Sequence, residues 1–162
     1  MGVKLPPFQT LLDSHQGDVY RFLVATVGPV EADDAFQETW ISALRAYPRL
    51  RGAENLRGWL LKIAQRKAID AHRARGRRPV PVESMPERVA ATPGGGAATL
   101  NGESDLWASV RDLPEKQRTA VFCRSVLGMP YDELAELLGS SEDAARRNVH
   151  EGLKKLREEW TR

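Results

Sequence analysis

The sequence contains a single cysteine, Cys123, and no apolar run near the roughly 20 residues that a membrane-spanning helix needs. One cysteine cannot form an internal disulfide or a zinc site built on several thiolates. Its apolar helical surroundings favour a buried thiol over a redox switch. The first residues also lack the charged and then apolar order of a secretory signal peptide. These absences predict a cytoplasmic protein without a membrane span.

Residues that could carry catalysis or bind a metal are scattered along the chain. His15, His72 and His150 lie in separate predicted elements, and no phosphate-binding loop is present. The acids between residues 31 and 38 crowd the start of a predicted helix, where they favour the helix dipole. That acidic start is either a protein-binding face or a solvated one. The sequence therefore predicts no enzyme, no cofactor and no metal site.

The first block, residues 8–78, predicts three amphipathic helices, because apolar residues recur at three- and four-residue steps. Gly28-Pro29 separates the first two helices, and Pro48 closes the second. Within the second helix, Leu44 falls among the positions predicted to face inward.

The stretch 79–104 is rich in proline and glycine and shows no apolar period, which is typical of a linker. Fully extended, it would reach on the order of 80 Å. The second block, residues 105–160, is again helical, with Val126, Leu153 and Trp160 predicted to face inward. The sequence thus predicts an all-α fold of two small helical domains joined by a flexible linker.

The net charge is only +2, but basic residues concentrate at the end of the first block. Within 56–78, Asp70 is the only acid among Arg57, Lys62, Arg66, Lys67, Arg73, Arg75, Arg77 and Arg78. A basic stripe of this density indicates a surface for polyanions, with a solvated helix face as the alternative. Trp59 lies within it, and stacking combined with charge suits single-stranded nucleic acid. The alternative is that Trp59 belongs to the core, as a single Trp at helical spacing more often does.

The second block contains the pattern of a helix-turn-helix: a short helix, a turn at Gly139 and a longer helix. In that motif the second helix enters the major groove of DNA. Ser140 or Ser141 can cap this helix. Its predicted outward residues are Arg146, Arg147, Asn148, His150, Glu151, Lys154 and Lys155. Arginine can bind guanine and asparagine can bind adenine bidentately. The alternative is a helical hairpin with a charged solvent face.

The order of these pieces resembles the extracytoplasmic-function (ECF) family of bacterial RNA polymerase σ factors. The resemblance lies in segments of both blocks: ADDAFQETW (32–40) and NLRGWLLKIA (55–64) of σ region 2, and LPEKQR (113–118), YDELAELLG (131–139) and the helix 146–157 of σ region 4. It covers 8–78 as region 2 and 105–160 as region 4, on either side of the 79–104 linker.

The resemblance implies a σ factor that binds core RNA polymerase, directs promoter-specific initiation and makes no bonds itself. The residues facing core polymerase would be Asp34, Gln37, Glu38 and Trp40. The melted −10 strand would lie along Asn55, Trp59, Lys62, Arg66, Lys67 and Arg73, with a flipped base near Asn55. The −35 duplex would be bound by Ser141, Arg146, Arg147, Asn148, His150 and Lys154. An anti-σ protein is a further partner that the family implies.

Three positions depart from the family pattern: Arg66 stands where Asn is usual, and Asp143 and Glu151 place acid on the DNA-facing side of the last helix. Two other hypotheses fit parts of the sequence. One is a standalone regulator that uses only the helix-turn-helix, and the other is a nucleic-acid-processing enzyme, which would need an acidic or metal-binding cluster.

Overall fold

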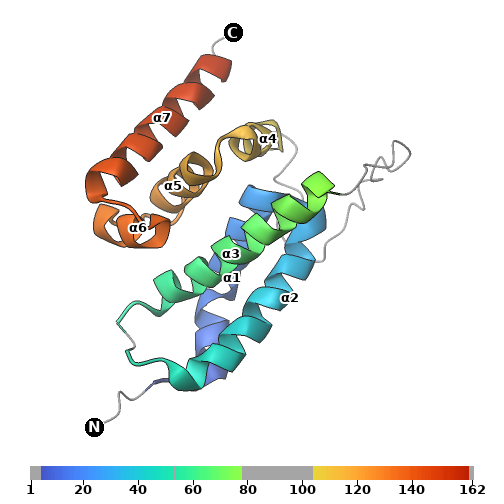
Figure 1. Cartoon of the computed structure of the whole chain (residues 1–162), viewed down its shortest axis with the longest axis vertical. Helices are drawn as coiled ribbons and strands as arrows, with labels where there is room; N and C mark the ends of the chain where they lie inside the picture. The colour runs from blue at the N-terminus through green and yellow to red at the C-terminus, as the bar shows by residue number, and fades with distance from the viewer. Residues whose placement is uncertain (1–4, 53, 78–103, 161–162) are drawn as a thin grey trace.

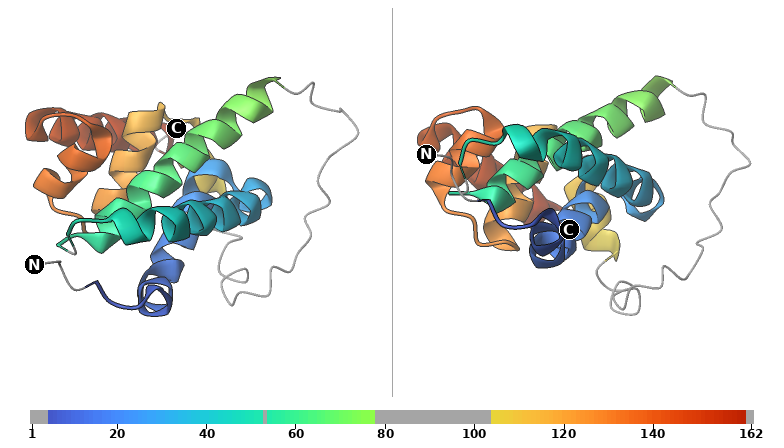
Figure 2. Two further views of the ribbon diagram at one scale, coloured as in Figure 1. Left: turned by 60° about the horizontal axis from the view of Figure 1, so that its bottom comes forward. Right: turned by 90° about the horizontal axis from the view of Figure 1, so that it is seen from below.

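The computed structural model describes residues 5–52, 54–77 and 104–160, and these form seven α-helices and a 3₁₀ turn, with no strand among them. The elements are α1 (Phe8–Val27), α2 (Pro29–Ala46), the 3₁₀ turn Tyr47–Arg49, α3 (Leu56–Arg77), α4 (Ser104–Asp112), α5 (Glu115–Ser125), α6 (Tyr131–Leu138) and α7 (Glu142–Trp160). Helices α1–α3 form one bundle and α4–α7 a second beside it (Figures 1 and 2). The predicted all-α fold is confirmed. Of the predicted linker, 79–103 lies outside the described residues.

The first bundle depends on a sharp reversal between α1 and α2. Gly28 has a φ of 87°, a conformation that favours glycine, and its N–H closes α1 by bonding Val24 O at 2.9 Å. Pro29 then begins α2, where its fixed φ suits the first helical position. The reversal lays α2 along α1, and Val19 of α1 and Leu60 of α3 are fully buried in the apolar core.

The second bundle is built on a close approach of α7 to α5. Gly152 is buried in the middle of α7, and a Cβ atom there would lie 2.5 Å from Val121 Cγ2 of α5. Such a distance is well inside van der Waals contact, so only glycine allows this spacing between the helices. The remaining buried residues of α7 are Ala145, Val149 and Leu156.

Four apolar residues predicted to face inward are exposed instead. Leu44, Val126, Leu153 and Trp160 expose 56%, 43%, 37% and 55% of their surface. In α7 the reason is Gly152, which is buried close to Val121 of α5. The buried side of the helix therefore passes through position 152, and the next residue, Leu153, points outward. The prediction from periodicity used apolar side chains only. Gly152 has no side chain, so its buried position was missed.

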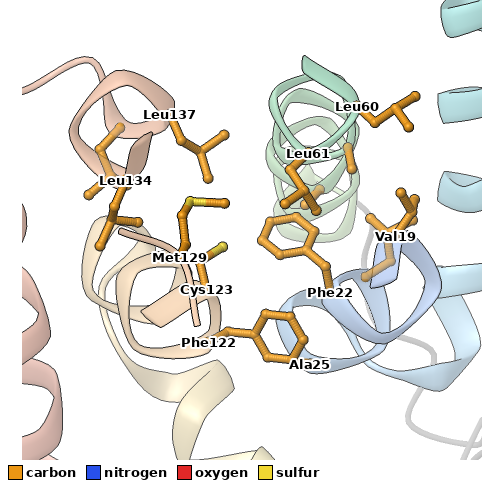
Figure 3. Packing of buried hydrophobic residues seen from close by; sticks show 14 of the residues in the cluster. Val19, Phe22, Ala25, Leu60, Leu61, Phe122, Cys123, Met129, Leu134 and Leu137 are labelled. Atoms are coloured by element: carbon orange, nitrogen blue, oxygen red, sulfur yellow. The ribbon is translucent and has the colours of Figure 1, made fainter. Parts of the chain in front are cut away.

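The two bundles share one apolar core, which nothing in the sequence predicted. The rings of Phe22 in α1 and Phe122 in α5 meet edge to face with centroids 5.8 Å apart. Cys123 and Met129 are fully buried and lie opposite Leu61 and Phe22 of the first bundle (Figure 3). We call this packing of α1 and α3 against α4, α5 and α6 the docked arrangement.

A buried arginine contributes the main polar contact of the docked arrangement. Arg118, in α5, is 8% exposed and donates from Nη1 to the Thr26 carbonyl at 3.0 Å. Thr26 lies in the last turn of α1, where carbonyls have no partner within the helix and the dipole attracts cations. His72 Nε2 of α3 lies 2.8 Å from the same oxygen and contacts Arg118 Nη1. Three helices from both bundles therefore meet at one carbonyl.

A Gly152→Ala substitution should lower the melting temperature, because the added methyl group overlaps Val121 and forces α7 away from α5. Overpacking of this kind costs about 1–3 kcal/mol. Thermal unfolding followed by circular dichroism measures it. Gly17→Ala is the matched control, since Gly17 lies in α1 with nothing within 4 Å of the added atom. Helix propensity should leave that variant as stable as the wild type or more so. Equal melting temperatures for the two variants would contradict the close approach at Gly152.

Candidate nucleic-acid and polymerase interfaces

The turn between α6 and α7 has the backbone geometry of a helix-turn-helix. Gly139 is left-handed, with a φ of 65°, and the N–H groups of Gly139 and Ser140 bond the last carbonyls of α6 at 3.2 and 2.9 Å. Ser141 then caps α7, because its Oγ accepts the Ala144 N–H at 3.1 Å. Of the two serines that could cap the helix, the structure selects Ser141.

The outer face of α7 carries most of the predicted DNA-binding residues. Arg146, Arg147, His150 and Lys154 are exposed, and Asn148 is half-buried. Arg147, His150 and Lys154 lie opposite the buried stripe through Gly152, so packing against α5 and α6 holds the helix while leaving this side open. Of the acids that depart from the family pattern, Asp143 is exposed on this same face, one turn before Arg147, and Glu151 is half-buried.

Two residues beside this face were missed from the sequence. The ring of Tyr131, at the start of α6, has the guanidinium of Arg146 4.6 Å from its centroid and that of Arg124 4.2 Å away. Arg124 also donates to the Met129 carbonyl at 3.0 Å. Cations within about 6 Å of an aromatic centroid are attracted by the ring, so Tyr131 orders both side chains. Residues 124, 131 and 146 share no helical period, which is why periodicity could not group them.

The exposed side of α3 forms a basic row. Lys62, Arg66 and Arg73 are exposed at steps of four and seven residues, which places them on one helix face, and Lys67 is half-buried. Trp59 is half-buried and packs against Tyr47, with ring centroids 6.1 Å apart. Its indole therefore belongs partly to the core and partly to the surface, as both sequence interpretations of Trp59 allowed.

Asn55 caps α3. Its Oδ1 accepts the Gly58 N–H at 3.0 Å, and a Cβ at Gly58 would lie 2.4 Å from the Asn55 amide nitrogen. The glycine therefore allows the amide to fold over the first turn of the helix. Asn55 is the residue near which the family resemblance implies a flipped base, and this cap fixes its side chain against the first turn of α3.

One face of α2 presents acids, followed toward its end by apolar side chains. Asp34, Gln37 and Glu38 are exposed, and Ile41 and Leu44 follow on the same side with exposures of 50% and 56%. The sequence predicted the acidic part but not the apolar part. A row of exposed aliphatic side chains bordered by charges is typical of a protein-binding surface.

Trp40, grouped with those acids from the sequence, does not share their face. It is 7% exposed, and its ring meets Phe8 and Phe36 edge to face at centroid distances of 5.9 and 6.1 Å. The structure thus places Trp40 underneath the exposed surface of α2, where it packs the helix onto α1.

Comparisons with known proteins agree with this arrangement. Residues 11–78 match the Sigma-70 region 2 family, and residues 104–156 match the Sigma-70 region 4 family. The ECF RNA polymerase sigma factor SigD of Mycobacterium tuberculosis is 35% identical over 158 residues, which cover 92% of this chain and 74% of SigD. The chain belongs to the ECF σ factor family. It is a σ factor that directs promoter-specific transcription initiation, and σ factors are not enzymes.

Two solved structures share the fold. CnrH, in complex with the cytosolic domain of CnrY, aligns with a TM-score of 0.73 at 21% identity over 95% of this chain and 87% of CnrH. RpoE, in complex with the anti-sigma factor NepR from Bartonella quintana, aligns at 0.71 and 18% identity over 93% of this chain and 94% of RpoE. Within the described part of this σ factor, no helix is long and apolar enough to cross a membrane.

A Ser141→Ala substitution should destabilise α7 by about 1 kcal/mol, because the Ala144 N–H loses its acceptor. Thermal or urea unfolding measures the change. Ser140→Ala is the matched control: the Ser140 hydroxyl donates only to the Ser141 carbonyl at an exposed site, 3.2 Å away. Removing it should change stability by much less. A larger loss from Ser140→Ala would contradict the assignment of the cap.

Proposed function

We propose that this σ factor divides promoter recognition among three helix faces. The outer face of α7 binds the −35 duplex, the basic row of α3 binds the opened −10 strand, and the exposed face of α2 binds core RNA polymerase. The observation that carries the proposal is the helix-turn-helix with an arginine-rich, unburied face on α7. The chain would act in the cytoplasm, together with the polymerase.

Support for the −35 assignment comes from where α7 places its charges. Arg146 and Arg147 lie in the N-terminal half of the helix, the part that meets base edges when such a helix enters the major groove. Arginine binds the O6 and N7 atoms of guanine bidentately, and lysine and arginine also bind phosphates. His150 and Lys154 continue the row by one and two further turns.

Support for the −10 assignment comes from α3. Lys62, Arg66 and Arg73 run along one exposed face and would follow a phosphate backbone. Trp59 offers a half-buried ring at the start of the same helix. Ring and charge together suit a single strand better than a duplex, because an opened base exposes a face for stacking. Arg66 would add a phosphate contact where the family pattern has Asn.

Support for the polymerase assignment comes from the composition of the α2 face. Ile41 and Leu44 supply apolar area that the fold leaves uncovered, and Asp34 and Glu38 supply charge at its edge. Large aliphatic contacts with a charged rim give both affinity and orientation in protein interfaces. Because the matched solved structures contain CnrY and the anti-sigma factor NepR, we include an anti-σ protein among the partners proposed for this chain.

Two double variants should separate the proposed roles. Arg146→Ala/Arg147→Ala should retain co-elution with core polymerase but lower run-off transcription about tenfold or more, because each lost base contact costs about 1–3 kcal/mol. Ile41→Lys/Leu44→Lys should lose co-elution, because charge replaces apolar contact area. Each variant is the control for the other, and circular dichroism checks that both fold. Absence of co-elution for the wild type, combined with tight binding to duplex alone, would instead favour a standalone helix-turn-helix regulator.

Tyr131→Leu should weaken binding of a −35 duplex by the holoenzyme about two- to fivefold, because Arg146 loses the ring that orders it. Tyr131→Phe is the matched control, since it keeps the aromatic face and should bind like the wild type. Fluorescence anisotropy of a labelled duplex measures both. Equal weakening by the two variants would show that the hydroxyl group, and not the ring, is what matters.

A further inference from the structure

Asp143 lies on the side of α7 that faces away from the protein core. Successive residues of an α-helix are about 100° apart, so Asp143, Arg147, His150 and Lys154 fall within about 60° of one another around the helix axis. All four are exposed, and the buried Gly152 lies on the opposite side. Asp143 therefore places a carboxylate within the surface proposed to bind the −35 duplex.

Two other polar residues in the N-terminal half of α7 lie away from the centre of this face. The guanidinium of Arg146 is held to one side, 4.6 Å from the centroid of the Tyr131 ring of α6. Asn148 is half-buried and lies beside the buried stripe of the helix. In the first two turns of α7, the residues at the centre of the face are therefore Asp143 and Arg147.

Neither of these side chains is occupied by a contact within the described part of the chain. The hydrogen bonds and ion pairs among the described residues include none from the Asp143 carboxylate or the Arg147 guanidinium. Residues four apart on a helix have Cβ atoms about 5–6 Å apart, and stacked base pairs are about 3.4 Å apart. The two side chains are therefore spaced to reach neighbouring base pairs.

The chemistry of a carboxylate makes it selective among the four bases in the major groove. A carboxylate accepts hydrogen bonds and donates none. Guanine and thymine present acceptors there and no donor, adenine presents an acceptor beside its donor, and cytosine presents its N4 amino group alone. Acidic side chains therefore accept a hydrogen bond from cytosine N4, whereas arginine donates two to O6 and N7 of guanine.

We propose that Asp143 and Arg147 determine the sequence preference at two adjacent base pairs of the −35 element, where Asp143 selects cytosine and Arg147 selects guanine. Arg146, which Tyr131 holds at the edge of the face, binds the phosphate backbone instead. This proposal rests on the −35 role proposed for α7 above. It also explains the acid at position 143, which departs from the family pattern. Phosphates repel a carboxylate, so Asp143 disfavours every sequence that offers it no cytosine N4.

The proposal is tested by selecting from a library of random DNA duplexes with holoenzyme formed from the full-length chain and core polymerase. Asp143→Asn is the decisive variant. Because an amide binds N6 and N7 of adenine bidentately, this variant should change the preferred base at one position from cytosine to adenine. Asp143→Ala should lower the discrimination at that position about tenfold and leave the neighbouring guanine selected.

Glu142→Gln is the matched control. It removes one negative charge from the same exposed first turn of α7, but its side chain lies about 100° from Asp143 around the helix axis. It should keep the preferred bases of the wild type. Circular dichroism checks that all variants fold.

The two arginines should differ in the same selection. Arg147→Ala should remove the preference for guanine at the position next to the cytosine. Arg146→Ala should weaken binding to all sequences alike, and the slope of log affinity against log salt should fall by about one.

Three results would overturn the proposal while leaving α7 as the helix that binds the −35 duplex. The Asp143 variants could select the same bases as the wild type, the position that responds to them could carry a base other than cytosine in the wild type, or Glu142→Gln could shift the preference as much as Asp143→Asn does. If the wild-type holoenzyme selects no sequence at all, the −35 role itself fails, and this proposal fails with it.

Discussion

The carbonyl of Thr26 is the main point at which the two halves of the molecule are joined by polar contacts. It is available because Gly28-Pro29 ends α1, so no residue one turn later can donate to it through the helix. Arg118 and His72 reach it from α5 and α3. A sharp turn required for the first bundle thus creates the acceptor that holds the second.

All three proposed binding faces arise from the same constraint. A helix that packs on two neighbours buries about half of its circumference, and its remaining side is free to carry charge or apolar area for a partner. In α7 the buried side passes through Gly152, which leaves the arginines outward. In α2, Trp40 packs inward and leaves Ile41 and Leu44 exposed. The proposed binding residues therefore lie on the sides of the helices that are not packed in the core.

Much of this could be predicted from the sequence, because helix limits depend on local chemistry. The reversal at Gly28-Pro29 and the turn at Gly139 were predicted, and the order of the segments identified the family. Which side of a helix is buried depends on its neighbours, so Leu44 and Trp160 were wrongly placed in the core.

Contacts between distant segments leave no periodic signal, so neither the meeting of Phe22 with Phe122 nor the stacking of Arg124 and Arg146 on Tyr131 could be foreseen. Ser140 and Ser141 carry the same chemistry, so the sequence alone does not distinguish which of them caps α7.

Because Gly152 has no side chain, the middle of α7 is the point where the helix lies close to α5 and about which it could tilt. Ten residues separate Gly152 from the first residue of the helix, a length of about 15 Å. A small tilt at this point is therefore amplified into a larger displacement at the end that would approach DNA, whereas specific contacts tolerate errors of only about 0.5 Å. The orientation of α7 toward DNA therefore depends on its contact with α5, which lies away from the proposed DNA-binding face.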